Sequence, residues 1–242
     1  ALARTVRNTL QRLHHSGEPD LRITVSSAVP MGSGLGSGAA VATALVRALM
    51  AHLGGYLTSR EISDLVYQTE LIHHGTPSGI DNTVIAFGKP LFFVRGHIDE
   101  VFWPGQPFWL VIGDTGVRSA TRDAVAGVRQ RWEANPAAYE ARFDAIGRLV
   151  TEGRQAIVKG DLPRLGQLMD ANQRELEAIG VSSPELEALI VAARHAGALG
   201  AKLSGGGLGG NMIALVGEQG GQAVAAALAF AGAQRVILTR VS

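Results

Sequence analysis

The chain has 242 residues, of which 46% are hydrophobic and 18% charged. This length and composition suffice for one large or two small domains with a sizeable core, and they exclude an intrinsically disordered chain. The net charge is +1, and the 22 basic and 21 acidic residues are mixed along the chain. Without a basic block, we expect neither nucleic acid nor an anionic membrane as a partner.

The sequence contains no cysteine, which excludes disulfides and thiolate metal sites and fits a cytoplasmic protein. Its longest apolar run, residues 39–53, is interrupted by Arg47 and His52 and is too short to span a bilayer. The chain starts at Ala1 rather than at Met and enters an amphipathic helical pattern at once. We therefore expect that an N-terminal portion of the protein is absent from this sequence.

The first part of the chain predicts helices and short strands around a glycine-rich loop. Thr58 and Glu61 have the spacing of a capping box, in which each residue's side chain accepts from the other's backbone N–H. A Pro-Gly-Gln-Pro segment at 104–107 indicates a boundary between two domains, residues 1–106 and 107–242. The predicted elements are a helix over 1–15, a strand over 21–28, a helix over 39–53, a helix from Thr58 to the turn at 74–79, and strands over 84–87 and 90–94.

The second part predicts a strand, a helical block and then a mixed strand and helix pattern. Asn135 and Ser183 each precede a proline, which is typical of a helix start. The predicted elements are a strand over 108–112, helices over 120–133, 136–159, 162–179 and 184–196, strands over 201–204 and 211–216, a helix over 219–231 and a strand over 234–241. The long Ala-rich helix over 136–159 leaves two roles open, an ordinary core role or a homodimer contact.

The glycine-rich segment 30–39 lies between a predicted strand and a predicted helix. Glycines allow backbone N–H groups to converge on an anion, and the start of a helix adds a positive partial charge. The segment contains no lysine, so it is not a P-loop. Gly34, Gly36 and Ala39 fit a Rossmann pattern formally, but the acidic residue expected about 20 residues further on is not suitably placed, because the first one, Glu61, already lies inside the next predicted helix. We therefore favour a phosphate-binding loop of another kind over a plain flexible turn.

Two carboxylates and a second glycine-rich loop complete the candidate site. Asp81 follows the turn His74 to Gly79, and Glu70 lies near the end of the preceding helix. Each also has a simple structural reading, as a helix cap and as a solvated helix residue. The segment 204–210 holds five glycines in the six positions after Ser204, more than a tight β-turn needs. His73 and His74 are adjacent and point apart on a helix, so we expect no metal site there. Together these features favour phosphoryl transfer to a small alcohol.

On these residues the chain resembles the GHMP kinases. Residues 30–40 are similar to the nucleotide loop of that family, and residues 202–211 to its C-terminal glycine motif. The segment 74–82, together with Asp114-Thr115-Gly116, resembles the branch of the family that phosphorylates mevalonate. The resemblance implies an α+β GHMP kinase fold, with an N-terminal part like ribosomal protein S5 domain 2 and a ferredoxin-like C-terminal domain. It also implies ATP-dependent phosphorylation of the 5-hydroxyl of mevalonate.

The resemblance also assigns roles to individual residues. It implies Asp81 as the catalytic group that contacts the attacking hydroxyl, and Glu70 with Ser37 as Mg²⁺ ligands. The implied nucleotide-binding residues are Ser27, Gly32, Ser33, Gly34, Leu35, Gly36, Ser37 and Gly38, and the implied substrate-binding residues are Ser78, Gly79, Thr115 and Gly206.

This sequence departs from the family pattern in two places. Gly38 stands where the family usually has a serine that ligates Mg²⁺, so we expect Ser37 or water to take that role. The family's N-terminal segment, which supplies a lysine beside the catalytic aspartate, has no counterpart, and Lys89, Lys159 and Lys202 do not fit its place. The resemblance therefore leaves open whether this chain is active on its own.

Other functions within and outside the family stay open. The rivals are phosphomevalonate kinase, mevalonate 3-kinase, diphosphomevalonate decarboxylase and a non-catalytic sensor of metabolites. The turn 74–82 contains no Arg or Lys, which favours an alcohol end without phosphate. Glu70 and Asp81 together count against a sensor, whereas Gly38 supports one.

Overall fold

The computed structural model describes residues 2–17, 19–27, 29, 34–74, 77–95, 100–118 and 121–242. The chain divides into two compact units, Ala1–Phe102 and Trp103–Ser242. The division falls just before the Pro-Gly-Gln-Pro segment in which the sequence predicts a domain boundary, and each unit is described separately below. Among the described residues, no helix has the length and apolar character that crossing a membrane requires.

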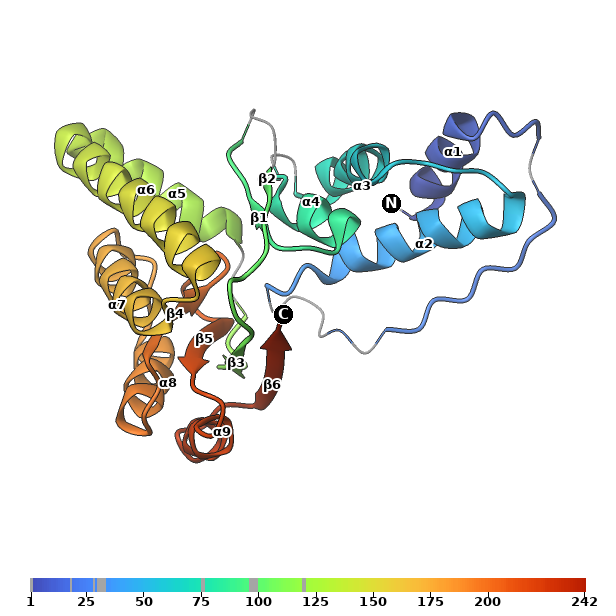
Figure 1. Ribbon diagram of the computed structural model, residues 1–242. Coiled ribbons are helices and arrows are strands. Elements are labelled where there is room, and N and C mark those ends of the chain that lie inside the picture. Colours follow the sequence, from blue (N-terminus) through green and yellow to red (C-terminus); the bar gives the residue numbers. More distant parts are fainter. Residues whose placement is uncertain are drawn as a thin grey trace. The chain divides into compact units, whose positions relative to one another are not determined.

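The first unit is a group of helices with one small sheet (Figure 1). Its core joins α2, α3 and α4 through apolar residues such as Val46, Val66 and Ala86, all fully buried. Arg47 on α2 donates to the Ala86 carbonyl oxygen at 2.9 Å, near the end of α4. The elements are α1 (Leu2–Arg12), α2 (Ser37–Leu53), α3 (Ser59–His74), α4 (Ile80–Phe87), β1 (Leu91–Phe92) and β2 (Glu100–Val101).

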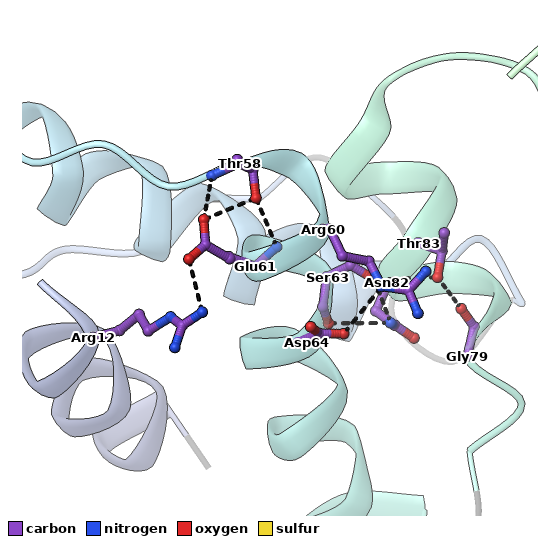
Figure 2. Close-up of polar contacts among 9 residues, drawn as sticks. All are labelled: Arg12, Thr58, Arg60, Glu61, Ser63, Asp64, Gly79, Asn82 and Thr83. Carbon is purple, nitrogen blue, oxygen red and sulfur yellow. Dashed lines mark hydrogen bonds and ion pairs between the residues drawn. The ribbon is translucent and has the colours of Figure 1, made fainter. Parts of the chain in front are cut away.

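The capping box at the start of α3 is confirmed (Figure 2). The backbone N–H of Thr58 donates to Glu61 Oε2 at 2.9 Å, and the Glu61 N–H donates to Thr58 Oγ1 at 3.3 Å. Arg12 of α1 also donates to Glu61 Oε1 at 2.7 Å. The hydrogen bond from the Thr58 backbone is the main cause that lowers the pKa of Glu61. One local motif thus starts α3 and ties it to α1.

Two predicted strands of the first unit are wrong. Residues 21–27 form no strand and are mostly exposed, because an alternating segment needs a neighbouring strand for its backbone hydrogen bonds and has none among the described residues. The apolar run 84–87 lies in helix α4, since a short apolar run fits a buried helix as well as a strand. The strand predicted over 90–94 is confirmed only at Leu91–Phe92, which pairs antiparallel with β2, a strand that the sequence did not predict.

The second unit is built on a four-stranded antiparallel sheet in the order β4-β5-β3-β6. In chain order its strands alternate with helical segments as strand, helices, two strands, helix, strand, which is the ferredoxin-like arrangement expected from the resemblance. The elements are β3 (Phe108–Asp114), α5 (Thr121–Ala134), α6 (Pro136–Lys159), α7 (Leu162–Ala178), α8 (Pro184–His195), β4 (Gly200–Ser204), β5 (Asn211–Val216), α9 (Gly221–Phe230) and β6 (Arg235–Val241).

Helices cover both faces of this sheet. Alternate strand residues such as Val111 and Met212 pack with α8 and α9 in one cluster. Their neighbours Phe108 and Leu215 pack with α6 and α7 in another. The period of two along each strand therefore divides the core into two layers. The predicted strands and helices of this unit are all confirmed to within a few residues.

Helix α7 also covers the outer edge of β4. Asp170 Oδ1 accepts from the Ala201 N–H at 2.9 Å, and Gln173 Oε1 accepts from the Leu203 N–H at 2.9 Å. A close approach of Gly166 to Gly200 allows this contact, since a Cβ on Gly166 would lie 2.1 Å from the Leu199 oxygen. Side chains of α7 thus satisfy backbone groups that an exposed edge strand would leave to solvent.

Candidate active site

The described part of the first glycine loop leads directly into α2. Gly36 is the N-cap of this helix, with φ 66° and ψ 30°, a left-handed conformation that glycine adopts without strain. The Ala40 N–H donates to the Gly36 carbonyl oxygen at 2.9 Å and closes the first turn. In the part of the chain that the structure describes, no side chain caps the helix. The N–H groups of the first turn, including that of Ser37, therefore form the positive end of a helix of 17 residues.

Asp81 lies against this helix start. A Cβ placed on Gly36 would be 3.3 Å from both Cβ and Cγ of Asp81, and 3.0 Å from Ile85 Cδ1. A side chain at Gly36 would therefore crowd Asp81 and Ile85, and the bare glycine backbone lets the carboxyl group of Asp81 approach the helix N-terminus. The first glycine loop and Asp81, both parts of the candidate site, thus lie next to each other. Asp81 itself is exposed, in the first turn of α4.

Two buried neighbours of Asp81 hold it in place (Figure 2). Asn82 Nδ2 donates to Ser63 Oγ at 2.9 Å and to the Ser63 carbonyl oxygen at 3.2 Å. Thr83 Oγ1 donates to the Gly79 carbonyl oxygen at 2.6 Å and lies 3.1 Å from Ser63 Oγ. Because α4 is anchored to α3 through these side chains, the position of Asp81 is set by packed polar contacts on both sides.

Glu70 reaches the same helix start from α3. Its side chain is buried, with 7% of its surface exposed. A Cβ placed on Gly38 would lie 3.0 Å from Glu70 Oε1. The two carboxylates thus approach α2 at Gly36 and at Gly38, on either side of Ser37. A charged side chain this deeply buried needs nearby polar or cationic groups, and the end of a helix provides them.

The arrangement fits a magnesium ion that is shared with a nucleotide. Among the described residues, His, Asp and Glu side chains nowhere gather in a group of three that could hold a metal. Mg²⁺ bound with phosphates generally uses only one or two carboxylates and keeps several waters. Glu70 Oε1 is buried beside Gly38, and Ser37 directly precedes Gly38 in the chain. The donor set is oxygen only, as a hard cation prefers.

The other predicted residues of the first unit occupy varied positions. Ser27 is exposed and accepts from the Val29 N–H at 3.2 Å, a local contact. Ser78 accepts from the Ile80 N–H at 3.3 Å at the start of α4. Gly79 is buried, and a Cβ there would lie 3.3 Å from Phe93 Cζ. Outside the described residues lie Gly32, Ser33, Gly75, Thr76 and the side chains of His73 and His74.

In the second unit, the glycine loop 204–210 is held from two sides by backbone hydrogen bonds. On one side, Thr115 donates to the Gly210 carbonyl oxygen through both its N–H and its Oγ1, each at 2.9 Å. On the other side, the Leu208 N–H donates to the Val181 carbonyl oxygen at 2.7 Å. A Cβ on Gly207 would lie only 2.0 Å from that same oxygen. The glycines here serve close packing of backbone on backbone.

Gly206 lies within this loop, and Lys202 precedes it on β4. A Cβ on Gly206 would meet Thr121 Oγ1 at 3.1 Å, so α5 begins directly against the loop. Lys202 on β4 donates to the Leu203 carbonyl oxygen at 2.8 Å, and burial lowers its pKa to about 8. Of the candidate substrate residues, Thr115 and Gly206 therefore belong to one braced structure in this unit.

Sequence reasoning missed the residues that position the site. Ser63, Asn82 and Thr83 act through tertiary hydrogen bonds between α3 and α4. Reading 84–87 as a strand hid the helix that carries Asp81. A sequence signal for it was Gly79 with the acidic Asp81 two residues later, a pattern that is compatible with a helix start.

Comparison with known families and proteins gives a consistent result. The GHMP kinases N terminal domain matches residues 2–89, and the GHMP kinases C terminal domain matches residues 154–234. A mevalonate kinase from Pyrococcus horikoshii is 41% identical over 91% of this chain and 66% of its own length. One from Thermococcus sibiricus is 38% identical over 98% of this chain and 72% of its own length. The chain thus spans about two thirds of the length of these curated relatives.

Solved structures show the same relationship. The crystal structure of L. major mevalonate kinase in complex with R-mevalonate has a TM-score of 0.86 and 31% identity, covering all of this chain and 76% of that one. Mevalonate kinase from Staphylococcus aureus has a TM-score of 0.74 and 30% identity, covering 98% of this chain and 76% of that one. On sequence, fold and the placement of its glycine loops, the chain belongs to the mevalonate kinase family of the GHMP kinases.

Proposed function

We propose that this protein transfers the γ-phosphoryl group of ATP to the 5-hydroxyl of mevalonate. Its relatives are named as mevalonate kinases, and one of the similar structures holds R-mevalonate. The observation that carries the proposal is the approach of Asp81 and Glu70 to the start of α2 at Gly36 and Gly38. A helix N-terminus binds phosphate, and carboxylates beside it can act on a hydroxyl group and on a cation.

In this proposal Asp81 orients the attacking hydroxyl and accepts its proton late in the transfer. Phosphoryl transfer has a loose transition state, so positioning and charge neutralisation supply most of the catalysis. An aspartate is normally a weak base at neutral pH. We therefore assign Asp81 mainly to orientation, a role that suits a side chain held between the anchored residues Asn82 and Gly79.

The N–H groups at the start of α2, with the preceding residues 32–36, would bind the ATP phosphates. Glu70 and Ser37 would hold Mg²⁺, which supplies charge neutralisation on the phosphates when bound. Gly38 contributes no side-chain oxygen, so water is expected to complete the coordination. Ser27 stays a prediction for nucleotide binding, and Ser78, Gly79, Thr115 and Gly206 stay predictions for mevalonate binding. A cytoplasmic location and a homodimer through α6 likewise remain predictions.

The test is a coupled assay for ADP formation with mevalonate, phosphomevalonate and diphosphomevalonate as separate substrates. Because the chain spans about two thirds of its relatives' length, the complete gene product should be assayed beside this chain. We expect ADP with mevalonate, and nuclear magnetic resonance of the product should show phosphate on O5. ADP formation with phosphomevalonate instead would contradict the proposal. Tight binding of ATP and mevalonate without any turnover would identify a sensor.

A further inference from the structure

The second unit contains a cavity whose lining residues, apart from Gly206, have no role in the proposed reaction. It has a volume of about 380 Å³, within the range of small-molecule sites. Its lining comes from α5, from Phe143 of α6, from Val181 and from Gly206 of the glycine loop. The lining residues are Ala124, Val125, Val128, Arg129, Trp132, Phe143, Val181 and Gly206.

The lining of the cavity is almost entirely apolar. Aliphatic and aromatic side chains form nearly all of it, and Arg129 is the one charged residue among them. The ion pairs described in this unit involve other arginines, namely Arg142, Arg164 and Arg194. Val125 and Phe143 are partly open to solvent, with 57% and 39% of their surfaces exposed. The cavity therefore has apolar walls, an accessible mouth and a single guanidinium group.

The far wall of the cavity is fixed in place. Arg131 of α5 donates to the Ile179 carbonyl oxygen at 2.8 Å and so ties α5 to the turn before Val181. That turn accepts from Leu208 of the glycine loop, and Gly206 of the loop packs on Thr121 at the start of α5. A ligand in the cavity would thus contact the glycine loop at Gly206, in a part of the unit where α5, the turn and the loop are tied together.

We propose that this cavity binds a small apolar molecule with a single carboxylate, of the class of medium-chain fatty acids. Apolar walls favour a hydrocarbon chain through removal of its surface from water. A guanidinium group pairs with a carboxylate by two parallel hydrogen bonds. One arginine matches one negative charge, so the site suits a monoanionic head better than a diphosphate. The proposal concerns binding to this cavity alone and does not depend on the kinase reaction.

The test uses octanoate and its neutral analogue 1-octanol as probes, in the absence of ATP. The protein has three tryptophans, and Trp132 lies in the cavity wall, so its fluorescence should change on binding and Trp132→Phe should remove that change. We expect saturable binding of one octanoate per chain. Arg129→Gln should weaken octanoate binding about threefold to tenfold, as expected for a partly solvated ion pair, and leave 1-octanol binding unchanged.

A second variant keeps the test independent of Arg129. Val125 is exposed on α5 and lies four residues before Arg129, so Val125→Glu should fold normally and pair with that arginine. It should weaken octanoate binding at least as much as Arg129→Gln. The matched control is Val150→Glu on α6, also four residues before an arginine and 48% exposed, which should have no effect. Binding that does not saturate, or that is equal in all these variants, would overturn the proposal.

Discussion

The two glycine-rich loops have similar composition but use their glycines in different ways. In the first unit, Gly36 and Gly38 leave space for the carboxylates of Asp81 and Glu70 at the start of a helix. In the second unit, Gly207 and its neighbours let the backbone of the loop press against the Val181 carbonyl oxygen. The glycines of the first loop leave space beside a helix start, whereas those of the second loop allow two backbone segments to pack tightly. Glycine content alone would not have separated these two roles.

Among changes to the second loop, we expect Gly207→Ala to lower the free energy of unfolding most. The added Cβ would lie 2.0 Å from the Val181 oxygen at a residue with φ 81°. The steric overlap and the strain of a left-handed alanine together should cost about 3 kcal/mol or more of unfolding free energy. All three tryptophans lie in the second unit, so denaturant unfolding followed by their fluorescence measures this loss. The control is Gly147→Ala in α6, where no atom lies within 4 Å and the stability should rise slightly. Equal free energies of unfolding for both variants would contradict the tight backbone packing at Gly207.

Asp81→Asn tests the first loop through its effect on turnover, in a variant that keeps its fold. Since Asp81 is exposed, the change should alter stability by no more than about 0.5 kcal/mol. Turnover of the complete protein should fall at least ~10²-fold, which is the lower end for groups that handle a proton. Asp64→Asn on α3, which removes only an exposed ion pair with Arg60, is the matched control. Near-normal turnover with unchanged substrate affinity would remove Asp81 from the mechanism.

Gly36→Ala separates strain from contact in the first unit. Alanine here would adopt φ 66° and would also press on Asp81 and Ile85. Gly54 has a similar φ of 74° with no atom within 4 Å, so Gly54→Ala reports strain alone, about 1 kcal/mol. Amide hydrogen exchange in α2 should show a larger loss for Gly36→Ala, and turnover should fall only in that variant. The same loss in both variants would mean that the carboxylate contact has no effect.

The smallest expected effects are changes in the free energy of unfolding with pH, and these changes have opposite signs in the two units. Hydrogen bonds from Thr58 lower the pKa of Glu61 below 4.5, so its stabilising contribution is present above that pH and is lost as pH falls through the folded pKa. Burial and the nearby Glu187 raise the pKa of Glu177, so stability falls as pH rises from 4.5 through the folded pKa. Glu177→Gln should therefore stabilise the protein slightly near pH 7 and not at pH 4. Carboxyl ¹³C resonances that titrate in the reverse order would contradict both assignments.

The same contrast explains how much the sequence could predict. In the second unit, strands such as 211–216 and helices such as 136–159 have clear periods and caps, and their bounds agree with the structure. In the first unit, the segments 21–28 and 84–87 were wrongly predicted as strands. Strand formation depends on neighbouring segments in the fold, which the local sequence does not reveal. The approach of Gly36 to Asp81 was inferred from motifs. The contacts that produce it, through Ser63 and Asn82, depend on tertiary packing and were missed.

The cover that α7 places over β4 has a consequence for how this protein would fail. While Asp170 and Gln173 occupy the N–H groups of Ala201 and Leu203, no foreign strand can add to that side of the sheet. A species in which α7 has detached would expose the unpaired edge of β4, with its apolar residues, to other molecules. We therefore expect any detachment of this one helix on heating to promote aggregation through the edge of β4.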